Sequence, residues 1–138
     1  MTKNTIYLNT GINCNKITNG AGTKNLIYSF DIPATEIKNN SKLRVVSVIH
    51  SSGGTNIIAI FKIKDIQFNN NYYWGNDGYY PTILTFDTNK PSYYNGSELL
   101  LGKQSINIIS IVATDSLTDV NSGIDTSFNF CITLEIEE

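Results

Sequence analysis

The residue types that could carry out acid–base or nucleophilic chemistry are sparse in this sequence. There is a single histidine, His50, which ends an apolar run and precedes the stretch SSGG. A histidine without a matching serine or cysteine motif is far more often structural than catalytic. The sequence contains no GxSxG, HExxH or paired CxxC spacing. The sequence therefore gives no starting point for a hydrolase or a zinc site.

Carboxylates are the remaining candidates for catalysis, because a pair of them can hydrolyse a glycosidic bond. Most of the acidic residues in question lie in turn-like stretches, where aspartate is favoured for its local hydrogen bonds. They are Glu36, Asp65, Asp77, Asp87, Glu98, Asp115, Asp119 and Asp125. No catalytic pair follows from their pattern, so the chain is predicted not to be an enzyme.

One segment, DVNSGID, has oxygen ligands at a spacing found in some calcium-binding loops. Asp119, Asn121 and Asp125 occupy positions 1, 3 and 7 of such a loop. Gly123 stands at position 5, however, and no acidic residue closes a twelve-residue loop. The same composition is common in a plain turn between two strands, which is the interpretation we favour. No metal site is predicted, and the three residues are kept as a calcium candidate beside that interpretation.

Aromatic residues are concentrated in two loop-like stretches. NNNYYWGNDGYYPT, residues 69–82, holds five aromatic rings, and KPSYYNG repeats the Tyr-Tyr pair. The first stretch is longer than a hairpin needs, and loops of that length are usually functional or packed on their own domain. The candidate interface or ligand residues are Tyr72, Tyr73, Trp74, Tyr79, Tyr80, Tyr93 and Tyr94.

Three interpretations of these aromatic residues stay open. They pack on their own domain, they form a platform that stacks on sugar rings, or they form an interface with another protein. Tyrosine and tryptophan are enriched at the centres of protein interfaces, where charge is depleted, and the first stretch has no Lys, Arg or Glu. An assembled interface would also account for strands that are apolar on both faces. We therefore favour protein contact over sugar binding.

Charge and cysteine content set further expectations. The net charge is −2 and Arg44 is the only arginine, so nucleic acid is not an expected partner. No apolar run approaches the length of a membrane span, and the N-terminus lacks the apolar core of a signal peptide. Cys14 and Cys131 are expected to be reduced thiols. Cys131 lies in a strand-like run and is expected to be buried.

Strand-like patterns run through the whole sequence. Residues 128–136 alternate apolar and polar side chains with a period of two, and residues 26–32 do the same. Three segments, 43–49, 57–66 and 106–113, are apolar on both faces and are predicted to be central strands covered on both sides. Shorter strand candidates are 5–8, 82–86 and 98–101.

The pattern changes within IFKIKDIQF. Lys62 and Lys64 share a face with Ile66 and Phe68, which predicts a bulge or the end of strand pairing near Asp65. Turn signals separate the segments, and PATEIKNN holds at most one helical turn. Eight strands without sustained helical periodicity predict an antiparallel β-sandwich, specifically a single eight-stranded jelly roll. Residues 1–138 are expected to form one domain.

As a whole, the chain resembles the small single jelly-roll structural proteins, minor capsid and penton-like, of large DNA viruses that infect algae and protists. The resemblance rests on the strand set and on NNNYYWGNDGYYPTIL, which runs into the strand at 82–86. It covers the whole chain as architecture. No signature matches residue by residue, so no functional residue is carried over.

The resemblance implies a non-enzymatic subunit that contacts other capsid proteins, and further copies of itself, through loops and strand edges. It also implies a location in the virion, assembled in the host cytoplasm, with no cofactor and no nucleic-acid contact. The alternative from another class is a carbohydrate- or receptor-binding module, such as a lectin-like head or fibre tip. That alternative predicts glycan binding that is lost when Trp74 is replaced by alanine.

Overall fold

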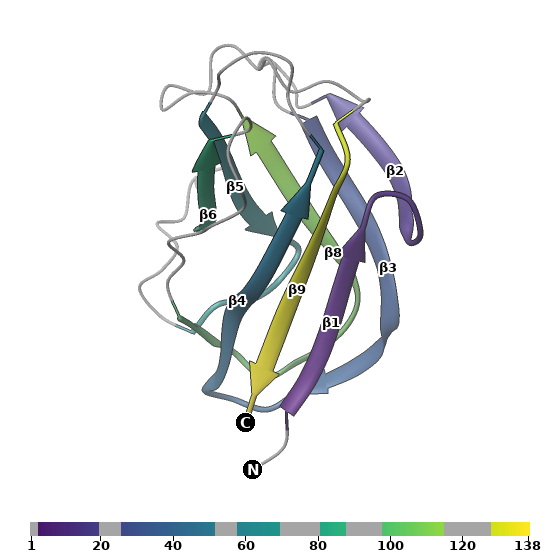
Figure 1. The fold of residues 1–138 in the computed structure, drawn as a ribbon. Helices are drawn as coiled ribbons and strands as arrows, with labels where there is room; N and C mark the ends of the chain where they lie inside the picture. The colour runs from purple at the N-terminus through teal and green to yellow at the C-terminus, as the bar shows by residue number, and fades with distance from the viewer. Residues whose placement is uncertain (1–2, 20–25, 52–57, 70–80, 88–97, 115–127) are drawn as a thin grey trace.

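The computed structural model describes residues 3–19, 26–51, 58–69, 81–87, 98–114 and 128–138. Within these ranges the chain forms nine β-strands (Figure 1). They are β1 (Lys3–Asn9), β2 (Cys14–Asn19), β3 (Leu26–Ile37), β4 (Ser41–His50), β5 (Ile58–Lys64), β6 (Thr82–Asp87), β7 (Leu99–Leu101), β8 (Gln104–Thr114) and β9 (Phe130–Glu137). The described part of the chain contains no helix that could cross a membrane.

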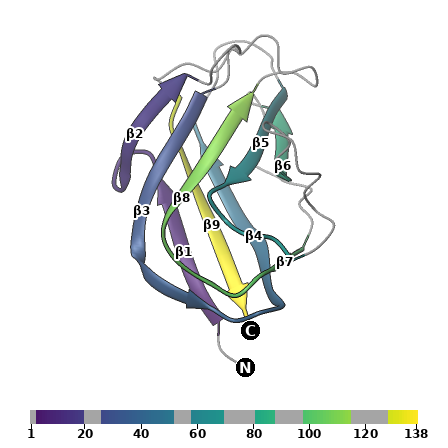
Figure 2. The ribbon, with the colours of Figure 1, turned by 180° about the vertical axis from the view of Figure 1, so that it is seen from behind.

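The strands form two antiparallel sheets that pack face to face (Figure 1 and Figure 2). Sheet A has the order β1-β9-β4-β7, and sheet B has the order β2-β3-β8-β5-β6. If β2 is set aside, β1 pairs with β9, β3 with β8, β4 with β7 and β5 with β6. The chain is thus one long hairpin wrapped around a sandwich, which is the jelly-roll order. The predicted antiparallel sandwich is confirmed.

Each of the eight predicted segments corresponds to a strand, but the count of eight missed β2. This strand has the polar sequence CNKITN, and its one partner among the described strands is β3, at the edge of sheet B. β3 also continues to Ile37, where the sequence indicated at most a helical turn. Pro33 lies in the register shift between Asp31 and Thr35. A bulge tolerates proline because no ladder hydrogen bond is required there.

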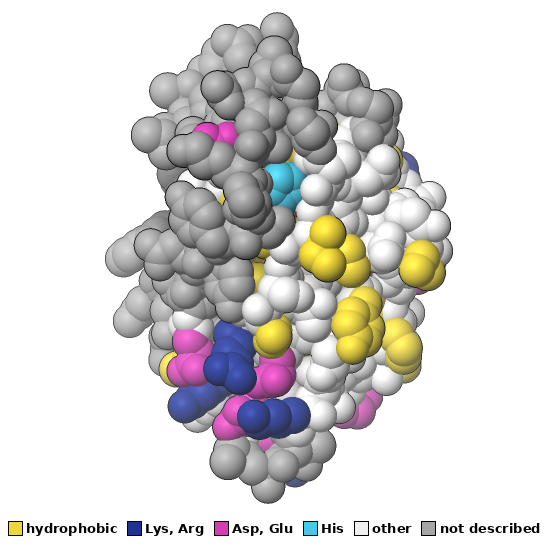
Figure 3. Space-filling view, in the orientation of Figure 1, with side chains coloured by type: hydrophobic (Ala, Val, Ile, Leu, Met, Phe, Trp, Pro, Cys, Tyr) yellow, Lys and Arg dark blue, Asp and Glu magenta, His cyan; other side chains and the backbone are white. Residues whose placement is uncertain are grey.

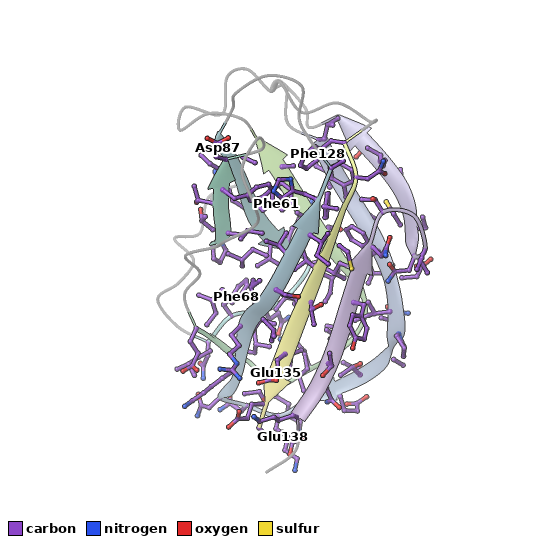
Figure 4. All side chains as sticks on the ribbon, viewed as in Figure 1. Phe61, Phe68, Asp87, Phe128, Glu135 and Glu138 are labelled. Carbon is purple, nitrogen blue, oxygen red and sulfur yellow. The ribbon has the colours of Figure 1, made fainter. Side chains whose placement is uncertain are left out.

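The hydrophobic core lies between the two sheets, and its aromatic rings gather toward the end where β4 stops at His50. The buried side chains of β9 alternate as predicted, and they are Phe130, Ile132, Leu134 and Ile136. The Phe130 ring lies 4.9 Å from that of Tyr28 and 4.7 Å from that of Phe61, centroid to centroid. Figure 4 shows Phe61 and Phe128 between the sheets. These rings join side chains from both sheets and so hold the sheets against each other.

The prediction that three strands are covered on both faces holds for parts of β5 and β8 and is wrong for β4. On the outer face of sheet B, Ile60 of β5 and Val112 of β8 are both buried. On the outer face of sheet A, Val46 and Ile49 of β4 are exposed. The apolar outer side of β4 is therefore open to solvent.

The predicted end of pairing near Asp65 is confirmed. β5 ends at Lys64, and Asp65 follows with a φ of 67°. This left-handed backbone resets the alternation of side chains, so Ile66 joins the core. Ser110 Oγ donates a hydrogen bond to Asp65 Oδ2 at 2.5 Å and so ties the end of β5 to β8.

Candidate binding surface

One end of the outer face of sheet A carries acidic and basic side chains that form ion pairs with one another. Glu135 of β9 accepts a hydrogen bond from Arg44 Nη2 at 2.7 Å and lies 3.8 Å from Lys3 Nζ. The hydrogen bond to Glu135 raises the pKa of Arg44. Further ion pairs at this end are Lys3–Glu137, Lys38–Glu138 and Lys42–Glu98. Figure 3 shows basic and acidic side chains intermixed there, and Figure 4 labels Glu135 and Glu138. These charges are paired with one another and leave no net charge for a partner.

The middle of the same face carries a group of exposed hydrophobic side chains, which we call the apolar surface. Its exposed members are Tyr7, Ile12, Val46 and Ile49, and the half-buried Cys131 belongs to it as well. Cys131 pairs across the sheet with Ile49 on one side and with the end of β1 on the other. Figure 3 shows hydrophobic side chains across the centre of this face. Single exposed hydrophobic residues are ordinary, whereas several on the same face indicate an interaction site.

A β-bulge in β4 creates part of this surface. The register of β4 against β9 shifts between Val45 and Ser47. Val45 and Val48 are buried, while Val46, Ser47 and Ile49 are exposed. In a regular strand starting from Val45, strict alternation would bury Ser47 and Ile49. The extra residue at Val46 reverses the alternation and turns Ile49 outward. Period-two analysis of the sequence cannot locate this insertion, so the apolar surface was missed.

Two hollows border the apolar surface. One, of about 340 Å³, has His50 and Ser51 in its wall at the end of β4. The other, of about 480 Å³, runs beside β1 and includes Ile12 and Pro33. Cys131 contributes to both hollows. The apolar surface is therefore indented on each side of Cys131, and a partner could insert side chains there.

The turn between β1 and β2 is held by side-chain amides. Asn13 Nδ2 donates hydrogen bonds to the carbonyl oxygens of Tyr7 and Asp31 at 2.8 and 2.9 Å. Asn13 Oδ1 accepts a hydrogen bond from the Asn9 N–H at 2.8 Å. The amide thus takes the place of a neighbouring strand's backbone. Held by this turn, Ile12 remains 83% exposed.

His50 closes one end of the core. Its Nδ1 lies 2.8 Å from the Ser51 carbonyl oxygen. Because a carbonyl oxygen can only accept, Nδ1 is the protonated nitrogen of the neutral ring and donates the hydrogen bond. The ring centroid lies 4.6 Å from that of Phe86 and 5.9 Å from that of Phe128. His50 Nε2 is buried and has no hydrogen-bond partner among the described residues. The imidazole therefore presents no free nitrogen at the surface.

Cys14 and Cys131 are both free thiols and half-buried. The expectation that Cys131 is buried is thus only partly met. It lies between Phe130 and Ile132, which face the core, so alternation turns Cys131 outward. Burial is the largest influence on the Cys14 thiol and raises its pKa, while a hydrogen bond with the Lys16 backbone lowers it.

The residues that the sequence indicated for binding lie outside the described residues. They are Tyr72, Tyr73, Trp74, Tyr79, Tyr80, Tyr93 and Tyr94, together with the calcium candidates Asp119, Asn121 and Asp125. Their points of attachment are nevertheless described. The Asn69 N–H donates to the Leu100 carbonyl at 2.9 Å, and Glu98 directly precedes β7. Asn69, the first residue of the stretch 69–82, therefore lies beside β7, the strand that follows the second aromatic stretch, KPSYYNG.

No group of three or more His, Cys, Asp or Glu side chains is placed to hold a metal ion within the described ranges. A scan against models of protein families and a search of curated proteins found no match. The chain is therefore characterised by its fold, a small all-β antiparallel sandwich of two sheets. Its function has to be argued from its surfaces, because a fold of this kind serves many functions.

Proposed function

We propose that this protein is a non-enzymatic structural subunit that assembles through the outer face of sheet A. The observation that supports this most directly is the apolar surface, whose four largest side chains are between 43% and 83% exposed. Covering apolar area contributes roughly 25 cal/mol per Å² removed from water. The balanced ion pairs beside it add no net charge to repel a partner.

A minor capsid or penton-like subunit of a large DNA virus is the biological setting that we propose. The jelly-roll strand order and the sequence resemblance support this setting. In it, the partners are other capsid proteins and further copies of the same chain, and the protein resides in the virion. Individually weak contacts hold such a shell firmly because symmetry repeats them.

A charge placed in the apolar surface tests the proposal. Ile49→Lys alters its centre, where Ile49 is 70% exposed, and Ile108→Lys is the matched control on the outer face of sheet B, where Ile108 is 40% exposed. Sedimentation velocity over a concentration series measures assembly of each variant. We expect wild type and Ile108→Lys to form the same oligomers and Ile49→Lys to form fewer or none.

Assembly by Ile49→Lys that equals wild type would contradict the use of this face. The alternative, a carbohydrate-binding module, would be identified by two results together. The wild-type protein would be a monomer that binds glycans on an array, and Trp74→Ala would abolish that glycan binding. Circular dichroism of each variant shows that the sandwich is intact. Because both isoleucines are exposed, neither substitution places a charge in the core.

A further inference from the structure

Among the strands that the structure describes, β1 has a neighbour on one side only, so its other side is an open edge of sheet A. The hydrogen bonds of Asn13 show which residues face that edge, because they reach the Asn9 N–H and the Tyr7 carbonyl away from β9. In an antiparallel ladder, the N–H and C=O of a residue point to the same side, and alternate residues share that side. Lys3, Thr5 and Tyr7 therefore direct backbone groups to the open edge.

Two other edges of the sandwich, those at β7 and β2, are protected. β7 is three residues long, and its Leu100 carbonyl accepts a hydrogen bond from Asn69 N–H. β2 is short and carries a bulge beside Lys16. In β1 the Asn13 amide covers the upper part of the edge. Such devices prevent strands from pairing with other chains. Asn13 also covers the Tyr7 carbonyl, whereas no group among the described residues covers the edge from Lys3 to the Tyr7 N–H.

Space for an incoming strand lies beside this uncovered segment. The hollow of about 480 Å³ has Thr5 and Tyr7 on the β1 side and Ile32 and Pro33 on the β3 side. It forms because the pairing of β2 with β3 stops at Phe30, before the bulge in β3. The open backbone groups are thus next to apolar walls, which is the combination that strand addition uses.

A second copy of the chain matches the edge when a two-fold axis passes through Thr5. Thr5 then faces Thr5 of the second copy, and Lys3 faces Tyr7, so no like charges meet. Cross-strand threonine pairs are favourable, and an ammonium group is attracted to a tyrosine ring. An axis at Lys3 would place the Lys3 ammonium groups of the two copies directly opposite each other, where they would repel. An axis at Tyr7 would pair Tyr7 with Tyr7 and Thr5 with Asn9, so that Asn13 would lie against the incoming strand at both residues. With the axis at Thr5, the incoming strand meets Asn13 only at the Tyr7 carbonyl, an oxygen that can accept a second hydrogen bond.

We infer that the protein dimerises by antiparallel pairing of β1 with β1 of a second copy, centred on Thr5. Sheet A then continues through the dimer as β7-β4-β9-β1 followed by its two-fold copy. An axis perpendicular to the sheet places both apolar surfaces on the same side of the dimer. The inference rests on the proposed function only in treating the chain as an assembling subunit, and it supplies that subunit with two binding faces instead of one.

Two substitutions at Thr5 test this dimer without altering the core. Thr5→Lys opposes two charges across the axis, and Thr5→Pro removes an N–H that points away from β9, a position where an edge strand tolerates proline. Ile108→Lys is the matched control, because it adds the same charge at an exposed residue of sheet B, away from both the β1 edge and the apolar surface. We expect both Thr5 variants to weaken dimerisation by about tenfold or more, and Ile108→Lys to leave it unchanged.

Amide hydrogen exchange measured by NMR locates the contact in the wild-type protein. Exchange at Thr5 and Tyr7 should slow as concentration rises, whereas Asn4 and Ile6, which face β9, should be slow at every concentration. Dimers that persist in both Thr5 variants would overturn the inference, as would a wild type that stays monomeric at its highest soluble concentration. Loss of assembly in Ile49→Lys but not in Thr5→Lys would overturn the edge dimer and leave the proposed function standing.

Discussion

Replacing Asn13 by alanine should loosen the β1–β2 turn and uncover the rest of the β1 edge. The change removes three hydrogen bonds, to Tyr7 O, Asp31 O and Asn9 N–H, each between 2.8 and 2.9 Å long. A hydrogen bond contributes about 0.5–1.5 kcal/mol net, and water partly replaces the two that are exposed. We therefore expect the free energy of unfolding to fall by about 2 kcal/mol.

Asn15→Ala is the matched control for this prediction. Asn15 lies two residues further on and, among the described residues, makes one side-chain hydrogen bond, from Nδ2 to Asp31 Oδ1 at 2.7 Å on the exposed surface. Its loss should cost less than about 1 kcal/mol. Urea unfolding followed by far-UV circular dichroism measures both variants. The midpoint should fall further for Asn13→Ala, while the slope stays unchanged because the surface exposed on unfolding is the same.

Hydrogen exchange provides a second test of the same reasoning. The Asn9 amide donates to Asn13 Oδ1, so it should exchange faster in Asn13→Ala and remain slow in Asn15→Ala. Equal destabilisation in the two variants would refute the reasoning, because it would mean that the Asn13 amide holds no more than an ordinary surface contact. An Asn9 amide that stays protected in Asn13→Ala would refute it as well.

Two further predictions concern the end of β5 and the Cys14 thiol. Asp65→Ala should be less stable than Asp65→Gly by about 1 kcal/mol. Both variants lose the hydrogen bond from Ser110, but only glycine adopts a φ of 67° without strain. Equal midpoints in urea unfolding would count against backbone strain at this residue. Iodoacetamide at pH 8 should alkylate Cys14 more slowly in the folded protein than in urea, because its raised pKa leaves less thiolate. The difference should shrink as the pH rises through that pKa, and equal rates, measured by peptide mass spectrometry, would contradict it.

Local sequence patterns were sufficient for the fold because the core strands obey a strict alternation. Residues 128–136 bury Phe130, Ile132, Leu134 and Ile136 on one face, as period two requires. β2 escaped prediction for a physical reason. As an edge strand it has one neighbour, so its sequence needs little hydrophobic character, and its position depends on pairing with β3.

The candidate site was less accessible to sequence analysis. The sequence directed attention to aromatic loops such as the one around Trp74, which lies outside the described residues. The apolar surface instead comes from β4, β9 and the β1–β2 turn. Ile49 reaches it only because the bulge at Val46 reverses the side-chain alternation. Ile12 reaches it because Asn13 bonds to residues of β1 and β3.

By itself, the sequence determined that this protein is an antiparallel sandwich, because hydrophobic periodicity is a local property that each strand carries. It also determined where β5 ends, through the change of pattern around Asp65. Only the tertiary structure decided which apolar side chains stay in water and which strand edge stays open. Those outcomes depend on register, bulges and hydrogen bonds between residues far apart in the chain, such as the pairing of Cys131 with Asn9 and Ile49.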